Sequence, residues 1–135
     1  LLAGGGATQI ALARHLRRFA ERFAGREQLA IEAFADALEI IPRTLAQNAG
    51  LDPLDSLLQT VAKQTTTGGT VGHRIGLNVD KKAPSDMVDD GVVEPLRITR
   101  QVLAGATEAA LSVLRIDDVL WAKQDPTEPD LPDED

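Results

Sequence analysis

Apolar residues recur along most of this chain with the period of a helix. They return every three or four positions in residues 7–24 and again in residues 27–49, which predicts two amphipathic helices. Gly25 lies between them and predicts the end of the first helix. Pro42 falls inside the second helix, where its missing amide hydrogen bond predicts a kink near residues 38–41.

Two further helices are predicted downstream. Asp52 is placed as an N-cap residue and Pro53 as the first residue of a third helix, which ends near Gln64. The stretch 65–70, rich in threonine and glycine, predicts a loop. A fourth, long helix is predicted over residues 96–114.

The pattern is that of β-structure in the remaining segments. Residues 73–79 predict a strand and residues 83–87 the segment that returns from it, which makes a small hairpin. Residues 116–122 predict a closing strand with no obvious partner in the chain, which indicates pairing with a missing part or another subunit. The prediction as a whole is a mainly α fold with a small β-hairpin and a closing C-terminal strand.

Composition narrows the class of protein. The 135 residues suit one ordinary domain, and the 43% hydrophobic content is enough to bury a core. The chain has no cysteine, which excludes disulfides and thiolate metal sites and suits a cytoplasmic protein. No apolar run is long enough for a membrane span, and no signal-peptide pattern is present. Because the first residue is Leu1 rather than methionine, we expect a piece of a longer protein.

The net charge of −7 arises mainly at the C-terminal end. Residues 125–135 contain acids and prolines but no base, so we expect residues 124–135 to be a disordered acidic tail. The rest of the chain is nearly neutral, with no basic stripe and few aromatic residues. This argues against nucleic-acid binding.

Three consecutive glycines precede the first predicted helix. Gly4, Gly5 and Gly6 could let a ligand approach the backbone and the helix amides, or they could form a plain strand-to-helix turn. Their spacing is neither a dinucleotide fingerprint nor a phosphate loop. Glu94 leaves a similar choice, because its carboxylate could accept hydrogen bonds from a ribose or could be an ordinary acid at a helix start.

Other polar residues favour structural roles. His15 and His73 are too few and too isolated to indicate a metal site. The adjacent acids at 89–90 and 117–118 do not have the facing geometry that paired-carboxylate catalysis needs. Trp121 favours packing at an interface over ligand binding.

Five stretches, taken in order and with their spacing, resemble the group II chaperonins, which are the archaeal thermosome subunits and their eukaryotic cytosolic relatives. The stretches are "AGGGA", "GREQLAIEAFADALEIIPRTLAQNAGLD", "GLNV", "DGVVEPLRITRQ" and "LRIDDVL". The second is long and highly specific, and the resemblance covers nearly everything from Leu1 to Lys123.

The resemblance implies that residues 1–123 are the C-terminal segment of the equatorial domain, the helical domain that binds ATP and makes most contacts in the ring. It implies ATP with Mg²⁺ as the cofactor of the full-length protein. The Gly-Asp-Gly-Thr-Thr loop that holds phosphates and magnesium, and the catalytic aspartate, would lie outside this chain. The apical domain that binds unfolded client proteins would also lie outside it. We therefore expect no ATPase activity from this chain alone.

The resemblance also assigns residues to a nucleotide site. In the family the "AGGGA" stretch lies near the ribose and base, the acid of "VVEP" contacts the ribose, and "GLNV" lies beside the adenine. The turn "DKKAPSD" departs from the family's turn, which often carries an aromatic residue and a glycine. The predicted nucleotide site therefore contains Gly4, Gly5, Gly6, Gly76, Leu77, Asn78 and Glu94.

The implied partners are the other subunits of the ring in the cytoplasm, with the closing strand shared between neighbouring subunits. An alternative of another class is a non-enzymatic helical protein-interaction module, whose acidic tail attracts basic partners. This alternative predicts no nucleotide affinity, even when the chain is joined to the rest of its protein.

Overall fold

The computed structural model describes residues 1–122, with side chains as far as Ile116. It divides into two units, residues 1–96 and the residues from 97 onward, each of which is described by itself. The predicted acidic tail, and the side chains of Asp117, Asp118 and Trp121, lie outside the described residues.

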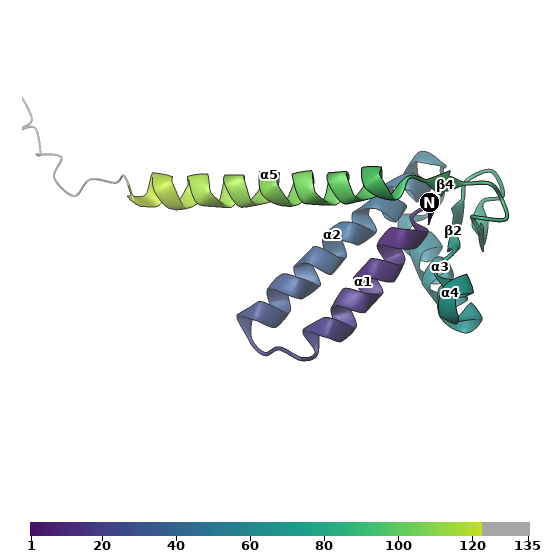
Figure 1. Cartoon of the computed structure of the whole chain (residues 1–135), viewed down its shortest axis with the longest axis horizontal. Helices are drawn as coiled ribbons and strands as arrows, with labels where there is room; N and C mark the ends of the chain where they lie inside the picture. Colours follow the sequence, from purple (N-terminus) through teal and green to yellow (C-terminus); the bar gives the residue numbers. More distant parts are fainter. Residues whose placement is uncertain (123–135) are drawn as a thin grey trace, which may run out of the picture. The chain divides into compact units, whose positions relative to one another are not determined.

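The first unit is built on a helical hairpin. Helix α1 (Ala7–Ala20) lies beside α2 (Arg26–Asn48), and α3 (Pro53–Thr67) packs against α2 (Figure 1). The facing helices bury mostly small residues, which lets two helix axes approach closely. The buried apolar residues of α1 and α2 are Ala7, Ile10, Ala13, Ala20, Ala35, Leu38 and Ala46.

The predicted start of α3 at Asp52–Pro53 is confirmed, whereas its predicted end near Gln64 is wrong. The Asp52 side chain accepts a hydrogen bond of 2.7 Å from the amide of Asp55, and Pro53 is the first helical residue. The predicted loop over residues 65–70 is wrong, because α3 continues to Thr67 and α4 (Gly69–Gly72) follows. Threonine hydroxyls in this run donate to carbonyls one turn back, Thr65 to Val61 at 2.8 Å, so they are satisfied within the helix.

Two small antiparallel sheets complete the first unit. Strand β2 (Ile75–Asn78) pairs with β3 (Ala83–Asp86), which confirms the predicted hairpin. Strand β1 (Leu2–Ala3) pairs with β4 (Val93–Glu94), so that Leu2 lies opposite Glu94. The sequence does not predict this second sheet, because two-residue strands are too short to show a period.

The closing strand predicted over residues 116–122 is wrong. Helix α5 runs without interruption from Leu96 to Ala122. No glycine or proline lies between Gly105 and the end of this helix. A helix pairs its own backbone groups, whereas a lone strand would leave them unpaired, so the helical solution needs no partner. The mainly α fold with small antiparallel sheets is confirmed.

Candidate functional site

The first unit brings the three segments of the predicted nucleotide site together. The amide of Leu77 donates a hydrogen bond of 2.8 Å to the carbonyl of Gly5. The amide of Gly4 donates at 2.9 Å to the carbonyl of Val92, and the β1–β4 pairing sets Glu94 opposite Leu2. Residues that are more than seventy positions apart in the sequence therefore meet where β1, β2 and β4 come together.

The glycines are required by this meeting of backbones. Gly5 has a φ of +61°, and a Cβ atom added there would lie 2.7 Å from the carbonyl oxygen of Leu77. A Cβ atom on Gly76 would lie 2.6 Å from the carbonyl oxygen of Gly4. Real Cβ atoms do not come this close to backbone atoms, so both positions need glycine. The backbone that approaches these glycines so closely is the protein's own.

Gly6 has a related reason to be glycine. Its φ is +74°, and it is the residue directly before α1. A Cβ atom there would lie 2.7 Å from Cβ of Pro42 in α2. Pro42 is buried, so the proline inside α2 lies against the turn that begins α1. The turn reading of the glycines is therefore confirmed, whereas contact with a ligand stays a prediction.

The Asn78 side chain holds the hairpin turn together. Its Nδ2 donates to a carboxylate oxygen of Asp90 at 2.8 Å. Its Oδ1 accepts hydrogen bonds of 3.0 Å from the amides of Asp80 and Lys81. The side chain is thus committed to structure, and Gly76, Leu77 and Asn78 are all buried.

Asp90 is the centre of this polar network, and reasoning from the sequence missed it. Its carboxylate also pairs with the ammonium of Lys81 and accepts a hydrogen bond from the Ser85 hydroxyl. The Lys81 ammonium, with the Ser85 and Asn78 donors, holds the pKa of Asp90 well below its usual range. Asp90 therefore stays ionised and acts as a structural anchor. An asparagine that accepts the amide two residues on is a known turn pattern, and Asn78 with Asp80 carried that signal.

Asp89, the residue before Asp90, forms an ion pair with a different cation. Asp89 pairs with Arg74, which also bonds the carboxylate of Asp86, its Nη2 lying 3.0 Å from Oδ2. Asp89 and Asp90 are therefore separate ion-pair partners. Their arrangement is not that of two carboxylates converging on a substrate.

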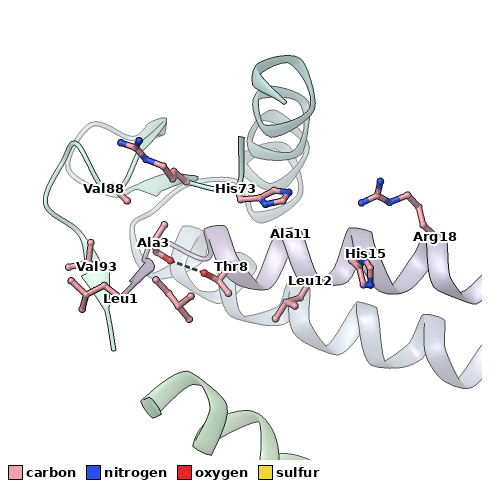
Figure 2. A pocket seen from close by; sticks show the side chains of 12 residues that line it. Leu1, Ala3, Thr8, Ala11, Leu12, His15, Arg18, His73, Val88 and Val93 are labelled. Atoms are coloured by element: carbon pink, nitrogen blue, oxygen red, sulfur yellow. Dashed lines mark hydrogen bonds between the residues drawn. The ribbon is translucent and has the colours of Figure 1, made fainter. Parts of the chain in front are cut away.

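A mainly apolar cavity of about 570 Å³ borders the predicted nucleotide site (Figure 2). Ala3 and Val93 line it, and their neighbours Gly4 and Glu94 belong to the site. The Thr8 hydroxyl, also at the cavity, donates to the carbonyl of Ala3 at 3.1 Å. None of the seven residues of the predicted nucleotide site lines this cavity. Its full lining is Leu1, Leu2, Ala3, Thr8, Ala11, Leu12, His15, Arg18, His73, Arg74, Val88 and Val93.

Two further features concern the part of the chain that the structure describes. There, no three histidine, cysteine or acidic side chains are grouped so that they could hold a metal ion. None of the helices described is both long enough and apolar enough to cross a membrane.

The sequence matches the TCP-1/cpn60 chaperonin family over residues 1–124. The chain belongs to this family. The predicted resemblance to the group II chaperonins is confirmed by individual relatives. This chain is 55% identical over 124 residues to a thermosome subunit of Methanocaldococcus jannaschii. The match covers 92% of this chain and 22% of that protein. The chain is 51% identical over 121 residues to the thermosome subunit beta of Thermoplasma acidophilum, which covers 90% of this chain and 22% of that protein.

A solved structure agrees with these sequence matches. The open-state monomer of a group II chaperonin from Methanococcoides burtonii superimposes with a TM-score of 0.78 at 42% identity. The match covers 84% of this chain and 27% of that one. The chain therefore spans about a fifth to a quarter of the length of the chaperonins that it matches.

Proposed function

We propose that this chain is the C-terminal segment of the equatorial domain of a group II chaperonin subunit and forms one wall of its ATP site. The full-length protein would assemble with other subunits into a cytoplasmic ring and use ATP to fold client proteins. The observation that carries the proposal is the meeting of Gly4–Gly6, Gly76–Asn78 and Glu94 in one region of a chaperonin-family chain.

The chemistry of these residues suits the sugar and base of a nucleotide better than its phosphates. Glu94 supplies a carboxylate, which accepts hydrogen bonds from hydroxyl groups and repels phosphate. Gly5, which is half-buried, offers peptide groups without a side chain to a sugar or base, whereas Leu77 is buried. ATP with Mg²⁺ would bring its own reactive phosphates, and the groups that hold them would come from elsewhere in the full-length protein.

Replacement of Glu94 tests the assignment. In the full-length protein, Glu94→Ala removes a carboxylate that accepts ribose hydroxyls, and loss of such charged hydrogen bonds weakens binding by about ten- to a hundredfold. Calorimetric titration with ADP measures the change. Glu27→Ala is a matched control, because Glu27 is an exposed acid in the first turn of α2, away from the meeting point of the strands.

The outcomes separate the proposal from its alternative. Tight ADP binding by the unaltered protein that is unchanged in Glu94→Ala would remove Glu94 from the site and leave the chaperonin assignment intact. A full-length protein without any nucleotide affinity would favour the helical interaction module instead.

A further inference from the structure

A second, smaller hollow of about 140 Å³ lies between α1 and the junction of α3 with α4. It shares Ala11, Arg18 and His73 with the mainly apolar cavity, but its remaining lining residues are polar or glycine. Arg14 and Arg18 reach it from α1, Gln64 and Thr65 line it from α3, and His73 lines it just beyond α4. Figure 2 shows the Arg18 side chain leaving α1 on the side on which His73 lies. No acidic residue lines this hollow.

The floor of the hollow is a buried and oriented amide. Gln64 is only 1% exposed. Its Nε2 donates to the carbonyl of Ala7 at 3.0 Å and to the carbonyl of Ile75 at 2.8 Å. These two bonds fix the direction of the amide, and its Oε1 accepts from Nη1 of Arg14 at 3.4 Å. Gln64 thereby holds one guanidinium at the hollow.

The positive charge gathered here is not neutralised by the described residues. Arg14 and Arg18 are four positions apart on one helix, a spacing at which like charges destabilise the helix. Among the described residues, the side chains of Arg18 and His73 have no hydrogen-bond or ion-pair partner.

Four acids in the first unit pair with other cations, and Glu21, three positions after Arg18, forms no ion pair with it. Asp36 and Glu39 pair with Arg17 on α1, and Asp86 and Asp89 pair with Arg74. The cations at the hollow therefore lack a counter-charge from the part of the chain that the structure describes.

We propose that this hollow binds a single oxyanionic group, a phosphate or a carboxylate, between Arg14, Arg18 and His73. Guanidinium groups match the spacing of oxygens in both anions, and an imidazole N–H adds a third donor. The hollow is much smaller than the usual 300–1,000 Å³ of a pocket for a larger ligand, which suits one anionic group. None of the seven residues of the predicted nucleotide site lines it, so the proposal does not depend on the proposed function.

Titration of the 135-residue chain with inorganic phosphate tests the site. The side-chain NMR signals of Arg14, Arg18 and His73 would be followed at fixed pH, with sodium chloride holding the ionic strength constant. We expect saturable shifts. Arg18→Gln should weaken phosphate binding about tenfold, because it removes a charged donor. Arg14→Gln should act in the same direction. Arg18 is exposed, so its replacement leaves the fold intact.

Arg22→Gln is the matched control. Arg22 lies four positions after Arg18, in the turn that follows α1, and does not line the hollow, so its loss should leave phosphate affinity unchanged. Linear shifts that sodium chloride reproduces, or equal loss of affinity in Arg18→Gln and Arg22→Gln, would overturn the proposal. A parallel titration with acetate identifies the occupant. Tighter binding of phosphate indicates a free phosphate, whereas equal affinity indicates a carboxylate side chain from another part of the protein.

Discussion

At the scale of single residues, the glycines carry most of the information. The sequence makes Gly5 a candidate for close approach and leaves open what approaches it, and it assigns Gly76 to the site only through the family resemblance. The structure answers that each faces the backbone of the other's segment, at hypothetical Cβ distances below 3 Å. This could not be predicted from either segment alone, because the steric requirement exists only after two remote segments meet.

Gly76→Ala should therefore be strongly destabilising. The added methyl group would meet the carbonyl oxygens of Gly4 and Gly5 at 2.6 and 2.9 Å, and backbone atoms cannot rotate away as a side chain can. We expect a loss of about 2–3 kcal/mol in the free energy of unfolding, as for overpacked cores. Urea denaturation measures it. Gly105→Ala, in the interior of α5, is the control and should stabilise by about 0.5–1 kcal/mol. Equal stability of Gly76→Ala and the unaltered chain would contradict the packing described.

Lys82 presents the opposite case. It is the one non-glycine residue with a positive φ, +52°, among those that the structure describes. A side chain costs about 1 kcal/mol in this left-handed conformation, and glycine does not bear that cost. Lys82→Gly should raise the free energy of unfolding by about that amount, which thermal unfolding would detect. Lys81→Gly should do the reverse, since it removes the ion pair with Asp90. If both variants behave alike, the strain at Lys82 is not real.

At the scale of elements, a helix or strand can be predicted from the sequence when it is long enough to show a hydrophobic period. The helices α1, α2 and α3 have enough turns to show their apolar period, and the Asp52–Pro53 start of α3 carries its own chemical signal. Strands β1 and β4 have two residues each and show no period, although their pairing joins the segments of the candidate site. The β-branched and apolar residues at 116–122 resemble a strand locally, and only the absence of a break after Leu114 shows that α5 continues.

The pairing of α1 with α2 rests partly on one buried acid. The Glu39 side chain is 4% exposed, and Nη2 of Arg17 bonds its Oε2 at 2.9 Å. The other cation nearby, Arg43, is 3.8 Å away. Arg17→Ala would leave the Glu39 carboxylate buried and poorly compensated.

We expect Arg17→Ala to cost about 2 kcal/mol of unfolding free energy, at the low end for a broken buried pair because Arg17 is partly exposed. Chemical denaturation would show the loss. The double variant Arg17→Leu with Glu39→Leu removes both charges and should recover most of it. Arg18→Ala on the same helix is the control, since Arg18 pairs with no described residue. A loss as large in Arg18→Ala would show that the ion pair is not responsible.

At the scale of the whole molecule, the chain corresponds to part of the length of the chaperonins that it matches. It spans 22% of its thermosome relatives, and α2 and α3 expose large apolar residues such as Leu29, Ile40 and Leu58. The proposed function places the phosphate-holding loop and the catalytic aspartate beyond this chain. The chain would therefore supply only one side of the ATP site, and this side alone would not hydrolyse ATP.

The purified 135-residue chain should accordingly hydrolyse ATP no faster than buffer does. A coupled phosphate-release assay with and without Mg²⁺ measures this, with the full-length protein as the positive control. Magnesium-dependent turnover by the short chain that survives further purification would contradict the division of the site between segments.

The β1–β4 ladder also decides when the candidate site can form during folding. Pairing Ala3 with Val93 closes a loop of about 90 residues. Closing a loop of this length costs about 4 kcal/mol in chain entropy, whereas helix formation joins only near neighbours in sequence and does not bear this cost. Helical hairpin contacts can form early, whereas the ladder must wait until the chain between its strands is compact. The meeting of Gly4 with Val92 is thus a late event, and an amide-exchange signal at Gly4 would report on completion of the fold.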